Sequence, residues 1–314
     1  MENISKKYDV IIAGGGVAGL TAAIYTARAG RSVLVLEAGY HGGQIVNAGS
    51  VENYPGIRRI PGFELAQNVY EQAVALGAEC VHERVIQVVK QNSGEFEVVT
   101  DGDKRRTAGA VIIATGTAAK TLDIPGEEKF KGKGVSYCGT CDGGFYKGRT
   151  VAVAGGGNSA LGEALHLSEI CDRVYLIHRR DSFRAEAHLI SLVGKKDNIE
   201  CIMNSSIEAV NGSDVVEAIE VSDNGRPDGR NRMIDVSCLF VSIGYEPKNK
   251  VFAGLIELDR DGYVAVGENC HTSCEGVYAA GDCRVKKVRQ LVTAVADGAV
   301  SAIEACEYVR QLRA

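Results

Sequence analysis

Two stretches of the chain repeat the same pattern of apolar and polar positions. Residues 9–39 and residues 150–180 each contain a short apolar run rich in β-branched residues, a glycine cluster, an Ala- and Leu-rich run, and a second apolar run. This order predicts a strand, a tight turn, a helix and a second, parallel strand. We therefore expect two copies of the βαβ unit that binds a dinucleotide.

Two further strand patterns mark where the chain passes between domains. The apolar run 111–116 ends in Thr115-Gly116, and the run 239–247 passes through Gly244 into a proline. These crossings bracket the second repeat. We predict an α/β fold of two Rossmann-like, three-layer ββα domains, in which residues 118–244 are inserted into a discontinuous domain of residues 1–117 and 245–314. Two thin connections would let the inserted domain rotate as a rigid body.

The segments around the first repeat are expected to complete its domain. Residues 70–109 have the pattern of a helix followed by short strands, and an alanine-rich helix is expected near residue 291. Asp282 lies where a strand ends just before that helix. Its carboxylate could hydrogen-bond a polyol such as the ribityl chain of a flavin, or it could be an ordinary helix N-cap.

Composition narrows the class of protein. A length of 314 residues suits two domains, and a hydrophobic content of 45% supplies a core without disulfides. The net charge of −5 and the lack of a long basic stripe argue against nucleic acid as a partner. We see no signal peptide and no apolar run of about 18 residues, so we expect a cytoplasmic protein without a membrane span.

The glycines of each repeat are spaced to hold a pyrophosphate. The first glycine allows the sharp turn, the second lets the backbone approach the phosphates, and the third small residue lets the helix pack closely. A structural turn without a ligand is the alternative for either copy. Superimposing the repeats aligns Gly14 with Gly155, Gly16 with Gly157, Gly19 with Ala160 and Glu37 with His178.

The end of the second strand distinguishes the two expected ligands. Glu37 can accept hydrogen bonds from a ribose diol and would repel a 2′-phosphate. The second repeat has His178, Arg179 and Arg180 there, with Arg184 close behind, and guanidinium groups bind phosphate monoesters. We expect FAD at the first turn and NADPH, rather than NADH, at the second. The alternative is that the arginines are only a solvated surface.

Cys138 and Cys141 are spaced Cys-x-x-Cys and are followed by Asp142. This spacing suits half a zinc site, a structural disulfide or a catalytic redox pair. Its position between the two dinucleotide turns favours a reversible dithiol that receives electrons from a flavin. The other closely spaced pair, Cys270 and Cys274, is interpreted as packing thiols, and no metal is expected.

A set of short motifs runs along essentially the whole chain. They are GGGVAGLTAAIY, GGQI (42–45), VENYPG (51–56), ATG (114–116), CGTCD (138–142), GGGNSA (155–160), HRRDSFRA (178–185), AAGD (279–282) and RQLVTAVADG (289–298). The combination of motifs is specific, although no single motif is, and with it the chain resembles the low-molecular-weight NADPH-dependent thioredoxin reductases. The resemblance implies a homodimer with tightly bound FAD that passes electrons from NADPH through Cys138/Cys141 to a thioredoxin-like protein.

The glycine turns and the resemblance together assign site residues. By the resemblance, Cys141 is the sulfur next to the flavin, Cys138 attacks the partner's disulfide, and Asp142 is the general acid and base. Residues expected at FAD are Gly14, Gly16, Gly19, Glu37, Gln44, Asn53, Thr115, Gly116, Asp282, Arg289 and Gln290. Residues expected at NADPH are Gly155, Gly157, Asn158, Ser159, Ala160, His178, Arg179, Arg180 and Arg184.

Two positions depart from the family pattern, and other functions stay open. Gly139 stands where the family usually has alanine, and Gly162 replaces the first residue of an acidic pair that ends in Glu163. Gly162 costs about 1 kcal/mol of helix propensity and removes a carboxylate near the NADPH turn. The alternatives are a ferredoxin-dependent reductase, another thioredoxin-like acceptor or a dithiol oxidase of the same fold. A non-catalytic nucleotide-binding module with zinc on the cysteine pair is a separate alternative.

Overall fold

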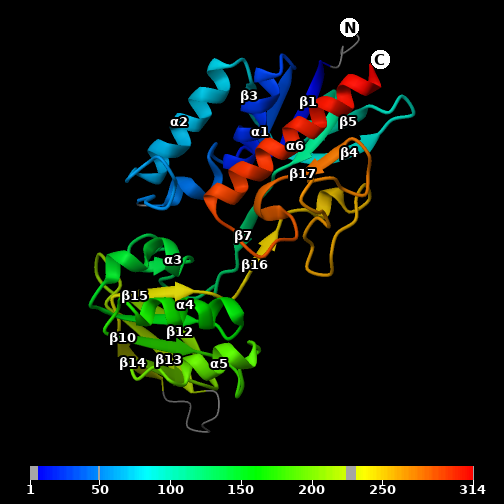
Figure 1. Cartoon of the computed structure of the whole chain (residues 1–314). Coiled ribbons are helices and arrows are strands. Elements are labelled where there is room, and N and C mark those ends of the chain that lie inside the picture. The colour runs from blue at the N-terminus through cyan, green and yellow to red at the C-terminus, as the bar shows by residue number, and fades with distance from the viewer. Residues whose placement is uncertain (1–5, 49, 224–230, 314) are drawn as a thin grey trace. The chain divides into compact units, whose positions relative to one another are not determined.

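The chain divides into two compact units in a computed structural model that describes residues 6–48, 50–223 and 231–313. Unit 1 comprises Met1–Ala118 and Glu246–Ala314, and unit 2 comprises Ala119–Tyr245. Strands β7 (Thr117–Ala119) and β16 (Tyr245–Pro247) run through the two boundaries and pair with each other. The whole of unit 2 is therefore inserted into unit 1 through two short connections (Figure 1).

Unit 1 is built on a seven-stranded sheet. The order β3-β2-β1-β6-β5-β4 is mixed, because β1, β2, β3 and β17 run parallel while the β4–β5–β6 meander is antiparallel. The strands are β1 (Lys7–Ala13), β2 (Val33–Glu37), β3 (Glu79–His82), β4 (Val85–Lys90), β5 (Phe96–Thr100), β6 (Arg105–Ile113) and β17 (Val277–Ala279). The helices are α1 (Val17–Arg28), α2 (Gly62–Ala75) and α6 (Leu291–Leu312), with short 3-10 turns η1 (Gly43–Asn47), η3 (Lys250–Phe252) and η4 (Gly281–Cys283).

The central strands of unit 1 are apolar on both faces because both faces are covered. Val10 and Ile12 of β1 face the layer formed by α1 and α6, which lie side by side in Figure 1. Ile11, between them in sequence, faces the opposite layer with Phe252 and Val264. No helix among the described residues is both long enough and apolar enough to cross a bilayer.

Unit 2 has three layers. A parallel sheet of order β11-β10-β9-β15-β8 lies between a helix layer and the antiparallel sheet β12-β13-β14. Its strands are β8 (Val135–Ser136), β9 (Thr150–Ala154), β10 (Arg173–Ile177), β11 (Ile199–Ile202), β12 (Ser205–Asn211), β13 (Ala218–Asp223), β14 (Arg232–Asp235) and β15 (Cys238–Val241). Its helical segments are α3 (Gly139–Asp142), η2 (Gly143–Tyr146), α4 (Asn158–Ser168) and α5 (Ala187–Val193).

The sequence repeat corresponds to a structural repeat. β1-α1-β2 in unit 1 and β9-α4-β10 in unit 2 have the same order, and each strand pair is parallel, with Ile12 opposite Val35 and Val153 opposite Leu176. The two predicted βαβ units are therefore confirmed. Each helix begins directly after its glycine turn, with Gly16 and Gly157 as N-cap residues.

Gly162 can be tested as a defect in helix propensity. A Cβ added at Gly162 in α4 would meet no atom within 4 Å, so G162A is expected to raise the free energy of unfolding by about 1 kcal/mol. Gly19 in α1 is the matched control, because its added Cβ would lie 2.0 Å from the Gly14 carbonyl oxygen. Urea titration should show G162A stabilised and G19A destabilised; a destabilised G162A would contradict the open space at that position.

Candidate redox site and nucleotide-binding turns

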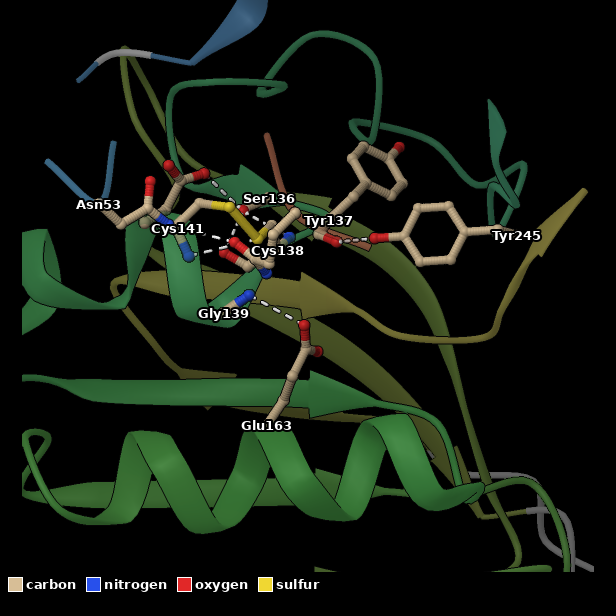
Figure 2. Close-up of a disulfide and its surroundings, with 10 residues drawn as sticks. Asn53, Ser136, Tyr137, Cys138, Gly139, Cys141, Glu163 and Tyr245 are labelled. Carbon is tan, nitrogen blue, oxygen red and sulfur yellow. Dashed lines mark hydrogen bonds between the residues drawn. A yellow bond between two sulfur atoms is a disulfide. The ribbon is translucent and has the colours of Figure 1, made fainter. Parts of the chain in front are cut away.

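Cys138 and Cys141 form a disulfide at the start of α3, with their Cα atoms 5.3 Å apart. The turn of α3 brings the cysteines together, because the Cys141 and Asp142 N–H groups both donate to the Cys138 carbonyl, at 3.2 and 3.1 Å. The Cys141 N–H also donates to Cys138 Sγ at 3.2 Å. Within unit 2, Cys141 is exposed and Cys138 is half-buried. The pair is a disulfide on the surface of its unit (Figure 2).

Ser136 holds both ends of this turn. Its hydroxyl donates to Asp142 Oδ2 at 2.6 Å and accepts the Cys138 N–H at 3.1 Å. Ser136 ends β8, where it pairs with Phe240 of the parallel sheet, so the hydroxyl is fixed by the sheet. Asp142 is half-buried and lies one residue beyond Cys141, which leaves its carboxyl group close to the dithiol.

Two further groups hold the redox turn from outside. Glu163 of α4 accepts the Gly139 N–H at 2.9 Å, just below the disulfide in Figure 2. The Tyr245 hydroxyl donates to the Tyr137 carbonyl at 2.7 Å, next to Cys138. Tyr245 is also the first residue of β16, so one side chain links the connecting strand to the segment that carries the disulfide.

The glycine turn of unit 1 is closely packed. Gly14 has φ +111°, and a Cβ there would lie 2.3 Å from the Ala114 carbonyl oxygen. Gly19 contacts Gly14 so closely that no side chain would fit. Glu37 accepts the Gly15 N–H and the Gly39 N–H, both at 2.6 Å. α1 has no side-chain cap, so the turn offers backbone N–H groups to an anion.

Asp282 provides the sharpest test of whether FAD fits unit 1. Its Oδ1 atom is enclosed and has no hydrogen-bond partner among the described residues. Burial raises the pKa of this carboxyl group, while Lys286 and Arg289 oppose the rise. Buried polar atoms are nearly always paired, so this acceptor indicates a missing donor such as a polyol hydroxyl. Asp282 lies in η4, and the N-cap of α6 is Gln290, so the N-cap alternative for Asp282 is wrong.

The other residues expected at FAD belong to unit 1 and are linked in pairs. Asn53 Nδ2 donates to Gln290 Oε1 at 3.1 Å, and Gln44 Nε2 donates to the Thr117 carbonyl. Arg289 lies over the Tyr263 ring, with its guanidinium carbon 4.4 Å from the centroid. Thr115 donates to Asn249 at 2.8 Å, and Gly116 follows with φ +62°. These contacts bring the expected residues into one unit and fit a long, polar ligand such as FAD.

The glycine turn of unit 2 is closely packed on one side and open on the other. Gly155 has φ +152°, and a Cβ there would lie 2.3 Å from the Ser242 carbonyl oxygen and 2.7 Å from the Ala160 methyl group. A Cβ at Gly157 would meet nothing within 4 Å. Gly157, Asn158 and Ser159 begin α4 without a side-chain cap. The N-terminus of this helix can therefore receive a pyrophosphate.

The loop of residues 178–186, called the arginine loop here, is held to that glycine turn by hydrogen bonds. The Arg184 N–H donates to the Gly156 carbonyl at 2.8 Å, and Asn158 exchanges two hydrogen bonds with Glu186, at 2.8 and 3.0 Å. Arg179, Arg180 and Arg184 are exposed, and within the described ranges none of the three has an ion-pair partner. Three exposed guanidinium groups beside this glycine turn fit the 2′-phosphate of NADPH.

His178 differs from the arginines that follow it. It is buried, and its ring lies where a side chain at Gly156 would stand, 2.3 Å from an added Cβ. Burial and then the nearby arginines lower its pKa, so the ring is neutral near pH 7. Its Nε2 atom has no partner in the described part of the chain. His178 therefore adds a neutral, enclosed polar atom rather than a fourth positive charge.

The remaining cysteines are free thiols. Cys270 is buried with φ +61°, and Arg284 Nη1 donates to its sulfur at 3.4 Å. Cys274 is half-buried, and no group of metal-ligating side chains occurs among the described residues. The other free thiols are Cys80, Cys171, Cys201, Cys238, Cys283 and Cys306.

The structure adds residues that sequence reasoning did not single out. Asn249 is fully buried and joins Thr115 to the Gly262 and Cys283 carbonyls, at 3.0 and 2.8 Å. Asp297 accepts the Gly281 N–H at 3.0 Å and pairs with Arg284 and Lys286, each at 2.7 Å. Asp297 lies inside the matched motif 289–298, which is the one signal that could have identified it.

Comparison with known proteins agrees with this geometry. The model of the family described as pyridine nucleotide-disulphide oxidoreductase matches residues 8–298. A thioredoxin reductase of Treponema pallidum is 43% identical over 310 residues, which cover 98% of each chain. A thioredoxin reductase of Listeria innocua is 40% identical over 313 residues, which cover 100% of this chain and 97% of the other.

Solved structures give the same result. The thioredoxin reductase of Streptococcus pyogenes superimposes with a TM-score of 0.91 at 34% identity, covering 98% of this chain and 99% of that one. The enzyme of Giardia duodenalis superimposes with a TM-score of 0.89, also at 34% identity, covering 98% and 100%. These matches imply FAD and NADPH as the cofactors of a flavoprotein disulfide reductase. The chain belongs to the pyridine nucleotide-disulphide oxidoreductase family.

Proposed function

We propose that this protein uses NADPH to reduce the disulfide of thioredoxin or of a thioredoxin-like protein. The observation that carries the proposal is the Cys138–Cys141 disulfide at the surface of unit 2, with Asp142 beside it. Relatives at about 40% identity that are named thioredoxin reductase support the choice of partner. The same unit carries the glycine turn and the arginines that suit NADPH.

Unit 1 supplies the residues proposed to hold FAD. Gly14, Gly16 and Gly19 would hold the phosphates, Glu37 would accept from a ribose diol, and Asp282 would accept from a polyol hydroxyl. When bound, FAD supplies a two-electron relay between NADPH and a disulfide. The chain contributes the fixed backbone of the turn and the enclosed oxygen of Asp282. Both are positioned by the fold itself, so the site is preorganised for the ligand.

The thiol chemistry needs one attacking and one resolving sulfur. In the dithiol form, the Cys138 thiolate attacks the partner's disulfide, so a Cys138–partner bond forms and the partner's second sulfur leaves as a thiolate. Cys141 then attacks Cys138 Sγ, the Cys138–Cys141 bond forms again, and the partner leaves as a dithiol. Two electrons pass to the partner, and each leaving thiolate takes up one proton.

Asp142 is proposed to handle the proton at the dithiol. Its carboxyl group is held by the Ser136 hydroxyl, and Ser136 also binds the Cys138 N–H, so the acid and the attacking cysteine share one anchor. A carboxyl group positioned in this way can give a proton to a leaving thiolate and take it back later. Ser136 thereby holds the Asp142 carboxyl group beside the disulfide.

We also propose a cytoplasmic homodimer. Eight free thiols beside a single disulfide are typical of a reducing compartment. Unit 1 exposes large apolar side chains on its helices, with Tyr25, Phe63 and Val292 at 44%, 64% and 44% exposure. Exposed apolar groups of this kind often mark a surface that a second chain covers. The resemblance to the thioredoxin reductases supports the same assembly.

The arginine loop should select the donor. Loss of Arg179 and Arg180 removes charge-assisted hydrogen bonds worth about 1.5–3 kcal/mol each, so R179A/R180A should raise the KM for NADPH at least about tenfold. The KM for NADH should change little, because NADH lacks the 2′-phosphate. A coupled assay with thioredoxin and a disulfide dye measures both values. An equal loss with NADH would contradict the 2′-phosphate assignment, and NADPH oxidation that ignores thioredoxin would contradict the partner.

The order of the two sulfurs can be tested by trapping. C141S should form a stable mixed disulfide with a single-cysteine thioredoxin activated by thionitrobenzoate, whereas C138S should not, because serine is not a nucleophile in this exchange. Release of thionitrobenzoate and non-reducing mass spectrometry measure the product. Exposure alone would favour Cys141, which is the more exposed sulfur, so trapping by C138S instead would reverse the assigned roles.

The buried carboxylate of Asp282 should lower the stability of the flavin-free protein and strengthen flavin binding. Its folded-state pKa is raised, so the ionised carboxylate costs stability above that pKa and costs none below the unfolded value. D282N should therefore stabilise the flavin-free protein at pH 7, and the gain should vanish near pH 3, below the unfolded-state pKa of an aspartate. Flavin retention should fall in the same variant, as measured by visible absorbance after gel filtration. A D282N protein that keeps its flavin would contradict the polyol assignment.

A further inference from the structure

Glu163 is a largely buried carboxyl group that accepts a hydrogen bond from the redox turn. It lies in the middle of α4, and its Oε1 atom accepts the Gly139 N–H at 2.9 Å (Figure 2). The other oxygen, Oε2, is enclosed and has no hydrogen-bond partner among the described residues.

The Gly139 N–H belongs to the peptide that follows Cys138. Three contacts hold this region: Ser136 accepts the Cys138 N–H, Glu163 accepts the Gly139 N–H, and Cys138 Sγ accepts the Cys141 N–H. The first two contacts fix the peptide planes on either side of the Cys138 Cα atom. The third stabilises negative charge on the sulfur when the disulfide is open.

Gly139 lets Glu163 approach this closely. A Cβ at Gly139 would lie 3.3 Å from Glu163 Cγ and 3.4 Å from both Cβ and Cδ, which is tight enough to push the glutamate stem away. The stem of Glu163 therefore packs against the backbone of the redox turn. The carboxyl group and the glycine form one contact between α4 and α3.

The surroundings of Glu163 are poorly suited to a free carboxylate. Burial raises the pKa of Glu163, and the Gly139 N–H, the Ser242 hydroxyl and His166 oppose the rise only in part. The other ionisable groups at the turn are Asp142 on α3 and Tyr146 on η2. No cationic side chain forms an ion pair with Glu163 in the described ranges, and the largest of the contacts that offset its burial is the Gly139 N–H of the redox turn.

We propose that Glu163 is a positioning residue for the redox-active dithiol: by accepting the Gly139 N–H, it holds Cys138 where the Cys141 N–H reaches its sulfur. The inference rests on the proposed disulfide-reductase function and adds a residue to it. The acceptor atom promotes reactivity of Cys138 because it keeps the N–H···S contact in place. A negative charge on Glu163 acts in the opposite direction, because it disfavours a thiolate nearby.

Two substitutions separate these effects. E163Q keeps an oxygen that can accept the Gly139 N–H and removes the charge, whereas E163A removes both. Glu169, an exposed residue at the end of the same helix that pairs with Lys196 at 3.9 Å, supplies the matched control E169A. The full-length holoenzyme is reduced with a phosphine, freed of reductant under anaerobic conditions, and treated with iodoacetamide at pH 7. Tandem mass spectrometry then gives the alkylation rate of each cysteine, with no need for NADPH or thioredoxin.

In E163A, iodoacetamide should alkylate Cys138 at least about threefold more slowly than in the wild type. This is the effect expected when the pKa of the Cys138 thiol rises by half a unit or more and the thiolate fraction falls. E163Q should alkylate at the wild-type rate or faster, and E169A at the wild-type rate. A merely structural role predicts a different pattern, in which a loosened fold speeds alkylation of the buried Cys171 and Cys238 along with Cys138. The proposal is overturned if E163A keeps the wild-type rate, or if E163Q, the isosteric variant, is as slow as E163A is expected to be. Failure of the thioredoxin assay with these alkylation rates intact would instead count against the proposed partner.

Discussion

The structure depends on close approach of backbone to backbone at two glycine turns. At Gly14 and Gly155 the left-handed backbone places the turn against a neighbouring strand end, at the Ala114 and Ser242 carbonyl oxygens. The helix that follows begins beside the strand and without a side-chain cap, so its first N–H groups stay available. This one constraint shapes both glycine turns, because it requires glycine in the turn and leaves the positive end of the following helix without a side-chain cap.

Buried polar atoms that have no hydrogen-bond partner in the described part of the chain lie at each of the three centres of the proposed chemistry. Asp282 Oδ1 lies at the expected flavin site, His178 Nε2 at the NADPH turn, and Glu163 Oε2 beside the disulfide. Each atom carries a cost in free energy that the surrounding fold must offset. At the first two positions a bound ligand can supply the missing partner. At Glu163 no ligand is required, because its other oxygen already acts on the redox turn.

The sequence alone was enough to predict the features that follow a regular spacing of residues along the chain. The βαβ repeats, the cysteine pair and the arginines are all visible as local patterns, and the repeats are confirmed as β1-α1-β2 and β9-α4-β10. Contacts between distant residues were not predictable in this way. Asn249 contacts Thr115 from a segment 134 residues away in the sequence, and Glu163 contacts Gly139 between two helices, but no periodicity relates these pairs. His178 aligned with Glu37 and was grouped with the arginines, although burial makes it a neutral packing residue against Gly156.

The two departures from the family pattern have different physical consequences. Gly162 faces open space, so a side chain there would cost nothing in packing, and the glycine only weakens α4. Gly139 is enclosed by the stem of Glu163, and a methyl group at that position would displace the glutamate by a few tenths of an ångström. The pairing of a bare glycine with a buried carboxyl group therefore shortens the contact between α4 and the redox turn. On this argument, Gly139 and Glu163 must be treated as one unit, and a change at either position acts on the reactivity of Cys138 through the other.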